Sequence, residues 1–189
     1  MSNREIMLNA LKKTVIKELK DRGFTGTYPH FKNIMSDCIE LIYFQTNKYG
    51  GSFTIVVSAV FPNNKVTNLS NLDATIDYSK VNVSCTNQRY RLEGMFDGWF
   101  YYRDVYKLPK GFYHDVSEKE SDSFSPPEDW KLLQKFDEKT ADEICIKINL
   151  QFQEAFKWLT KFEQKNRTKN KIKMCLTNKY LPKRTNKNN

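Results

Sequence analysis

Residues 38–61 read CIELIYFQTNKYGGSFTIVVSAVF, and this stretch decides the fold. Apolar side chains occupy every second position from Phe53 to Phe61, a period of two that is typical of a β-strand with one face in the core. From residue 38 to residue 46 both alternating sets are largely apolar, which predicts a central strand. Asn47 to Gly51 has the composition of a turn. We therefore expect residues 38–46 and 52–61 to pair antiparallel.

Further strands are predicted on both sides of this pair. Residues 31–35 precede it across a short turn, and residues 81–85 alternate as a half-buried strand should. Residues 89–92 and the aromatic run 99–102 complete the middle of the chain, and a further strand is expected after the turn at residues 94–98. Residues 107–129 are rich in Pro, Ser and acidic side chains, so we expect an exposed excursion there.

Two helices flank the predicted strands. Residues 4–21 carry an apolar side chain at every fourth position, and Gly23 follows as a stop signal. A longer apolar stripe covers residues 144–162, and Thr140 with Glu143 predicts a capping box at its start. The predicted fold class is α+β with two layers. An antiparallel sheet of four to six strands is covered on one face by an N-terminal helix and a long C-terminal helix.

The positive charge lies at the C-terminal end. The chain of 189 residues has 31 Lys and Arg against 22 Asp and Glu, a net charge of +9, but eight of the basic residues follow Lys165 and no acidic residue does. Residues 1–165 are predicted to form a single domain, and residues 166–189 a basic, largely flexible tail. Apolar side chains around Cys175 alternate as in a short strand, which could dock part of this tail.

The sequence lacks the motifs of common cofactor sites. Its seven glycines form neither phosphate-binding loop, its two histidines cannot make a multi-histidine metal site, and its four cysteines form no C-x-x-C pair. We expect no cofactor and reduced cysteines in the core. No apolar run is long enough for a membrane span, and charged residues interrupt the amino terminus where a signal peptide would be apolar. We expect no membrane contact and a cytoplasmic location.

One polar constellation stands apart from the predicted core. It combines Arg, aromatic and amide side chains, which is the composition of an interaction hot spot. Its members are Gln45, Lys48, Arg89, Arg91, Asp97 and Trp99. Two other interpretations remain open: the aromatic rings could stack on nucleic-acid bases, or an arginine could pair with Asp97 and have only a structural role.

An enzymatic alternative uses carboxylates. In a metal-dependent phosphodiesterase, acidic side chains hold Mg²⁺ and a lysine steadies the attacked phosphate. The candidates here are Asp37, Glu40, Glu128, Asp129 and Lys131. Their spacing is ordinary, and Glu40 falls on a strand expected to be buried, so this is the weakest of the hypotheses.

Four short motifs carry a resemblance. They are Arg22-Gly23-Phe24, Ile42-Tyr43-Phe44-Gln45 running into the next strand, Arg89-Tyr90-Arg91-Leu92, and Asp97-Gly98-Trp99-Phe100. Their order resembles a family of small bacterial proteins classified only as a domain of unknown function, which share a Phe-Gln strand, an Arg-x-Arg segment and a tryptophan doublet. Phe100 replaces the second tryptophan here. The resemblance covers about residues 5–162 and leaves the basic tail outside.

The resemblance implies a partner rather than a reaction. Members of the family resemble, at a distance, accessory or immunity-type proteins encoded near bacterial toxin and defence genes. No catalytic residue carries over. Our leading hypothesis is a non-enzymatic binding protein whose Arg and aromatic side chains engage another macromolecule, in the first place another protein, or a small anion. The alternative is a nucleic-acid-binding protein that uses the basic tail.

Overall fold

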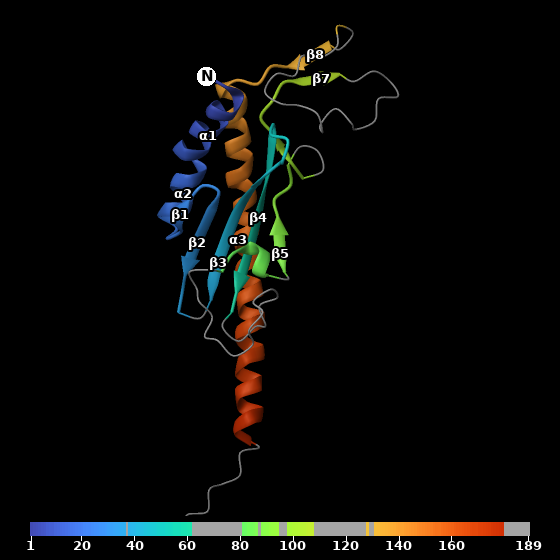
Figure 1. Ribbon diagram of the computed structural model, residues 1–189. Helices are drawn as coiled ribbons and strands as arrows, with labels where there is room; N and C mark the ends of the chain where they lie inside the picture. Colours follow the sequence, from blue (N-terminus) through green and yellow to red (C-terminus); the bar gives the residue numbers. More distant parts are fainter. Residues whose placement is uncertain are drawn as a thin grey trace, which may run out of the picture.

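The computed structural model describes residues 1–36, 38–61, 81–86, 88–94, 98–107, 128 and 131–179. One antiparallel sheet lies against a layer of helices, so the fold is α+β as predicted (Figure 1). The long C-terminal helix runs along the sheet, and the N-terminal helices lie beside it.

The sheet is built around the two strands expected from residues 38–61. Its strands are β1 (Thr25–Thr27), β2 (His30–Ile34), β3 (Ile39–Thr46), β4 (Ser52–Val60), β5 (Arg89–Arg91) and β6 (Phe100–Tyr101). The order is β1-β2-β3-β4-β5, each pair antiparallel, and β6 pairs with the beginning of β4. All nine residues of β4 are buried, so this strand is the centre of the fold.

The helical layer begins with two short helices, α1 (Asn3–Lys13) and α2 (Val15–Asp21), instead of one helix over residues 4–21. The break falls at Thr14, whose hydroxyl donates to the carbonyl of Ala10 at 2.8 Å. A hydroxyl bonded back to the preceding turn competes with the helical backbone pattern and bends helices. The apolar stripe still faces the sheet, because Leu11, Val15 and Leu19 are all buried.

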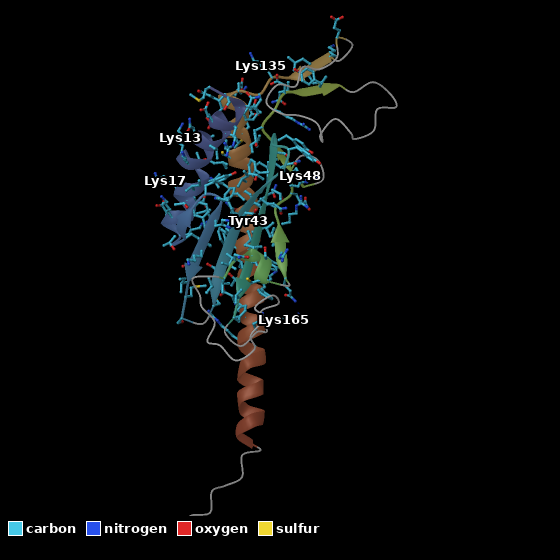
Figure 2. All side chains as sticks on the ribbon, viewed as in Figure 1. Lys13, Lys17, Tyr43, Lys48, Lys135 and Lys165 are labelled. Carbon is cyan, nitrogen blue, oxygen red and sulfur yellow. The ribbon has the colours of Figure 1, made fainter. Side chains whose placement is uncertain are left out.

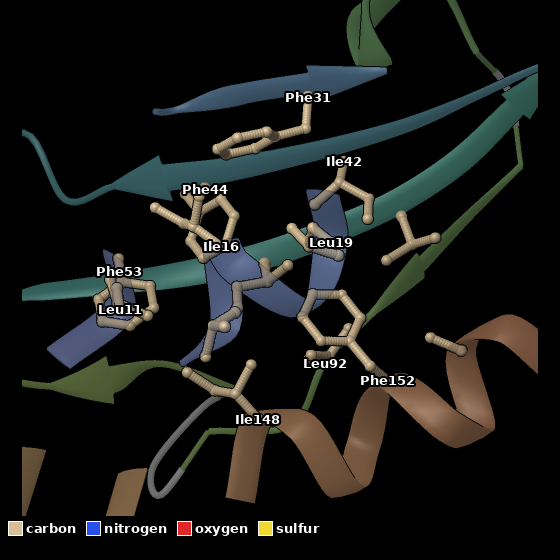
Figure 3. Packing of buried hydrophobic residues seen from close by; sticks show 14 of the residues in the cluster. Leu11, Ile16, Leu19, Phe31, Ile42, Phe44, Phe53, Leu92, Ile148 and Phe152 are labelled. Carbon is tan, nitrogen blue, oxygen red and sulfur yellow. The ribbon is translucent and has the colours of Figure 1, made fainter. Parts of the chain in front are cut away.

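The core lies between the sheet and the helices. Figure 3 shows Phe44 and Phe53 on the strands, Leu11 and Leu19 on the N-terminal helices, and Phe152 on the C-terminal helix packing together. Each of the five is at most 1% exposed. Burying such a side chain stabilises the folded state by about 1.5–3 kcal/mol, so this cluster is a principal source of stability.

The long helix α3 (Glu138–Lys179) starts earlier than predicted. The cap is Asp137 rather than Thr140: an Asp137 carboxylate oxygen accepts from the backbone N–H of Thr140 at 2.8 Å and from its hydroxyl at 2.9 Å. These hydrogen bonds favour the ionised carboxylate and lower the pKa of Asp137. The predicted capping box at Thr140 and Glu143 is therefore wrong by one turn.

The far end of α3 also differs from the prediction. The helix continues to Lys179, so residues 172–179 are helical where we expected a short strand. Figure 1 shows this part of α3 extending past the end of the sheet. No helix within the described part of the chain is both long enough and apolar enough to cross a membrane.

Two segments after β4 differ from the prediction. Residues Val83–Cys85 form a short 3₁₀ helix, η1, because the side chain of Asn82 accepts from the backbone N–H of Ser84 at 2.8 Å and tightens a turn. The strands β7 (Val105–Lys107) and β8 (Lys131–Gln134) form a separate two-stranded sheet. Most of the predicted excursion at 107–129 lies outside the described residues.

A pair of carboxyl groups lies on the helix face of the sheet. Asn33 donates to Glu40 on β3 at 2.9 Å, and Cys38 donates to Glu163 on α3 at 3.5 Å. Burial raises the pKa of Glu40; among the weaker causes, the Asn33 bond lowers it and the nearby Glu163 raises it. Arg167 lies 3.6 Å from Glu163 and compensates part of the negative charge.

This pair predicts a pH-dependent stability. A carboxyl group whose pKa is raised on folding stabilises the protein below its ordinary pKa, and the contribution is lost as pH rises through the folded-state value. Glu40→Gln keeps an acceptor for Asn33 but carries no charge. We therefore expect the free energy of unfolding of Glu40→Gln, measured by urea denaturation, to increase relative to wild type between pH 4.5 and pH 7.5.

The control is Glu154→Gln, which removes a carboxylate that is exposed on α3 and paired with Lys157. Its stability difference from wild type should change less over the same pH range than that of Glu40→Gln, because the side chain of Glu154 is exposed. A Glu40→Gln difference that is flat with pH would show that Glu40 titrates normally.

Candidate functional site

The face of the sheet away from the helices is divided into two parts. The register places Ile39, Leu41, Val56 and Val60 on this face, and the segment 81–86 covers them. Val81 and Val83 complete this second, smaller apolar cluster. The other part lies toward the turn between β3 and β4, and it carries the polar side chains. Figure 2 shows Tyr43 over the middle of the sheet and Lys48 beyond it in that turn.

Three of the predicted site residues come together on this second part. Gln45 is the cross-strand neighbour of Thr54, and Nε of Arg91 donates to the Thr54 hydroxyl at 2.9 Å. The guanidinium carbon of Arg91 lies 5.2 Å from the ring centroid of Trp99. Gln45 and Arg91 are exposed and Trp99 is half-buried. Arg91 thus connects Thr54, the register partner of Gln45, to Trp99, which precedes β6.

Two more cation–aromatic pairs lie at the same end of the sheet. The guanidinium carbon of Arg103 is 4.9 Å from the ring centroid of Tyr101, which pairs with Ser52 of β4. Lys48 Nζ is 4.4 Å from the ring centroid of Tyr49 in the β3–β4 turn. We call this set the cation–aromatic surface. Its members are Gln45, Lys48, Tyr49, Arg91, Trp99, Tyr101 and Arg103.

Arg89 has a different position from Arg91, although both lie on the same face of β5. Its Nε donates to the carbonyl of Thr86 at 3.1 Å, and its Nη2 donates to the carbonyl of Ser84 at 3.3 Å. Arg89 therefore fastens the end of η1 to the sheet and is directed away from Trp99. Asp97, the remaining predicted member, lies outside the described residues.

Glu93 and Gly94, which follow β5, make close contacts with α3 and with Trp99. A Cβ placed on Gly94 would overlap the backbone of Trp99, so only glycine allows this approach. The side chain of Gln151 on α3 binds the backbone of Glu93 twice, accepting from its N–H and donating to its carbonyl, each at 2.6 Å. Together they hold Glu93 to α3 and keep Gly94 next to the backbone of Trp99.

The cysteines and carboxylates do not form a reactive site in the described part of the chain. Burial raises the pKa of the Cys145 thiol to about 11, so it is protonated at neutral pH. Of the phosphodiesterase candidates, Glu40 faces the helices and Lys131 belongs to β8, while Asp37 and Asp129 lie outside the described residues. No three His, Cys, Asp or Glu side chains among those described could hold a metal ion together.

Sequence reasoning missed Thr54, Tyr43 and Arg103. A signal for Arg103 existed, because residues 99, 101 and 103 alternate onto one face of an extended segment. The part played by Thr54 depends on its pairing with Gln45 across the hairpin, and on Arg91 reaching it from a third strand. That second contact spans 37 residues and leaves no local pattern.

The approach of Gly94 to Trp99 makes a prediction. Gly94→Ala should cost about 1–3 kcal/mol of unfolding free energy, the usual range for overpacking. It should also shift the Trp99 indole N–H signal in a ¹H–¹⁵N spectrum, because the ring is displaced from Arg91. Gly50→Ala is the control, since no atom lies within 4 Å of its added Cβ and only its positive φ is strained. An unmoved Trp99 signal in Gly94→Ala would contradict the assigned contact.

The comparisons with known proteins agree with the resemblance seen in the sequence. Neither a curated protein nor a solved structure matches this chain. A family description does match over residues 15–161, from the start of α2 to the last turns of α3 on the sheet, and it leaves out the basic C-terminal end. The chain therefore belongs to the family described as a domain of unknown function, DUF4304.

Proposed function

We propose that this protein is a non-enzymatic binding protein whose cation–aromatic surface engages an acidic surface of a partner protein. The observation that carries the proposal is the stack of the exposed Arg91 guanidinium on Trp99, 5.2 Å from the ring centroid, on the face of the sheet opposite the described α-helices. Tryptophan, tyrosine and arginine are the residues that supply most of the binding energy at protein interfaces.

The charge of this face favours an acidic partner. Within the six described strands of the main sheet the only acidic residue is Glu40, and it points to the helix face. Lys48, Arg91 and Arg103 add three cations to the end of the open face. A guanidinium lying over an aromatic ring keeps N–H groups at its edge, which can donate to a carboxylate in a forked geometry.

The same geometry favours carboxylates over nucleic-acid bases at this surface. Base stacking needs an open ring face. Here Trp99 and Tyr101 each already have a guanidinium within 5.2 Å of the ring centroid, and both rings are half-buried. A cytoplasmic location and an immunity-type role in defence against a toxin remain predictions from the sequence and the family resemblance.

The proposal is tested by charge reversal on matched surfaces. Arg91→Glu/Arg103→Glu changes the net charge by four units on the cation–aromatic surface. Lys12→Glu/Lys17→Glu makes the same change at exposed positions of α1 and α2. A Glu-Ser repeat peptide is titrated into each protein, with a Gln-Ser repeat peptide as the neutral ligand, and ¹H–¹⁵N spectra report binding at the Trp99 indole.

We expect the acidic peptide to shift the Trp99 signal in wild type and in the α1–α2 variant. The Arg91/Arg103 variant should lose affinity by about thirtyfold or more, which corresponds to the ~2 kcal/mol of a hot spot. Unfolding curves establish that the variants are folded. Equal losses of affinity in both variants would refute the assigned binding surface. Peptide-induced signal shifts that leave the Trp99 indole signal unmoved would also refute it.

A further inference from the structure

The C-terminal part of α3 extends past the end of the sheet, and Glu163 is the last buried residue among those whose side chains are described. Up to that point the helix packs on the sheet: the rings of Phe162 and Phe61 lie 5.5 Å apart, Trp158 contacts Tyr90, and Glu163 is only 8% exposed. Beyond it Lys165 and Arg167 are exposed, and the helix continues past the sheet to Lys179 (Figure 1).

The whole net charge of the protein resides beyond that same residue. The nine Lys and Arg residues after Glu163 equal the net charge of +9, because the remaining 22 basic residues cancel the 22 acidic ones. The matched family region ends at residue 161, so this charge lies outside that region. A neutral body with a separate cationic extension concentrates its attraction for anions in one place.

We infer that residues 164–179 of α3 form a second binding surface, whose ligand is the phosphate backbone of duplex DNA. This surface is distinct from the cation–aromatic surface and does not depend on it. The helix from residue 164 to residue 179 is about 24 Å long at 1.5 Å per residue. Its six basic residues are Lys165, Arg167, Lys169, Lys171, Lys173 and Lys179.

The spacing of these residues explains why an extended polyanion fits. Like charges four residues apart repel each other on a helix, and Lys165, Lys169 and Lys173 continue a series that starts at the exposed Lys157 and Lys161. Lys157 has an acidic neighbour, Glu154 at 2.7 Å, and Arg167 lies 3.6 Å from Glu163, but no acidic residue follows Glu163 in the chain. Phosphates along a duplex would relieve this repulsion.

The dimensions of duplex DNA fit this part of α3. The duplex presents one negative charge per about 1.7 Å of its axis. Its major groove is about 12 Å wide and admits an α-helix with its side chains. Because the contacts are to phosphates, we expect affinity that depends on salt and not on base sequence.

The test compares two variants of the full chain with equal net charge. Lys165, Lys169, Lys171 and Lys173 are all changed to Gln in the first, and Lys12, Lys13, Lys17 and Lys20 in the second. Each variant carries a net charge of +5, which is four less than the +9 of the wild type. Fluorescence anisotropy with a labelled DNA duplex measures affinity from about 50 to 200 mM NaCl, the range over which phosphate contacts weaken strongly.

We expect wild type to bind with an affinity that falls steeply with salt. The α3 variant should lose at least about tenfold in affinity, and its salt slope should become shallower by about 3–4, since each phosphate contact contributes ~0.9. The variant on α1 and α2 should retain most of the wild-type affinity and most of the wild-type salt slope. Circular dichroism compares the helix content of the three proteins, and the acidic-peptide titration above should be unchanged in the α3 variant.

Three outcomes would overturn the inference. The first is no binding of the wild type to the duplex. The second is equal losses in the two variants, which would mean that binding follows net charge alone. The third is tighter binding to single-stranded DNA or to duplex RNA of the same sequence, which would assign the surface to a different nucleic acid.

Discussion

The structure depends on covering β4 on both faces. All nine residues of this strand are buried, including Ser52, Thr54 and Ser58, so neither face of the sheet's centre can be left to solvent. The helices cover one face through Phe53, Ile55 and Val57. On the opposite face the cover is assembled from short segments: residues 81–86 pack over Val56 and Val60, and Arg91 donates to Thr54.

This second cover produces the candidate site. A single long helix would cover this face of β4 with one repeating pattern of side chains. The short segments instead place different side chains over different parts of the strand. Arg89 binds backbone carbonyls and holds η1 down, while Arg91, two residues later, meets Thr54 and Trp99. The same two-residue period therefore gives Arg89 contacts with backbone carbonyls and Arg91 contacts with a hydroxyl and an aromatic ring.

The main elements of the fold could be predicted because their signals are local. The alternation from residue 38 to residue 61 and the apolar stripe of α3 are periodic patterns, and both produced the expected elements. The predictions that were wrong lie where a single side chain determines the local backbone structure. Asn82 turns an alternating segment into η1, and Thr14 divides an otherwise continuous helix.

Much of the candidate site could not be predicted for a different reason. Gln45, Arg91 and Trp99 were recognised as unusual because of their residue types, but their meeting point is Thr54, which lies between them in space and not in sequence. The carboxyl pair Glu40 and Glu163 is a further example. Its members are more than 120 residues apart, and they meet because α3 crosses the sheet next to the start of β3.

The double hydrogen bond from Gln151 to Glu93 has a consequence for self-association. Arg91 and Glu93 have the same parity along the chain, and Leu92 between them donates to Ile55 of β4, so the Glu93 backbone groups point away from the sheet. An unpaired edge of this kind can recruit a strand from another copy and start aggregation. The amide of Gln151 occupies those groups in the way a neighbouring strand would. One glutamine on α3 thus protects this end of the sheet from edge-to-edge growth.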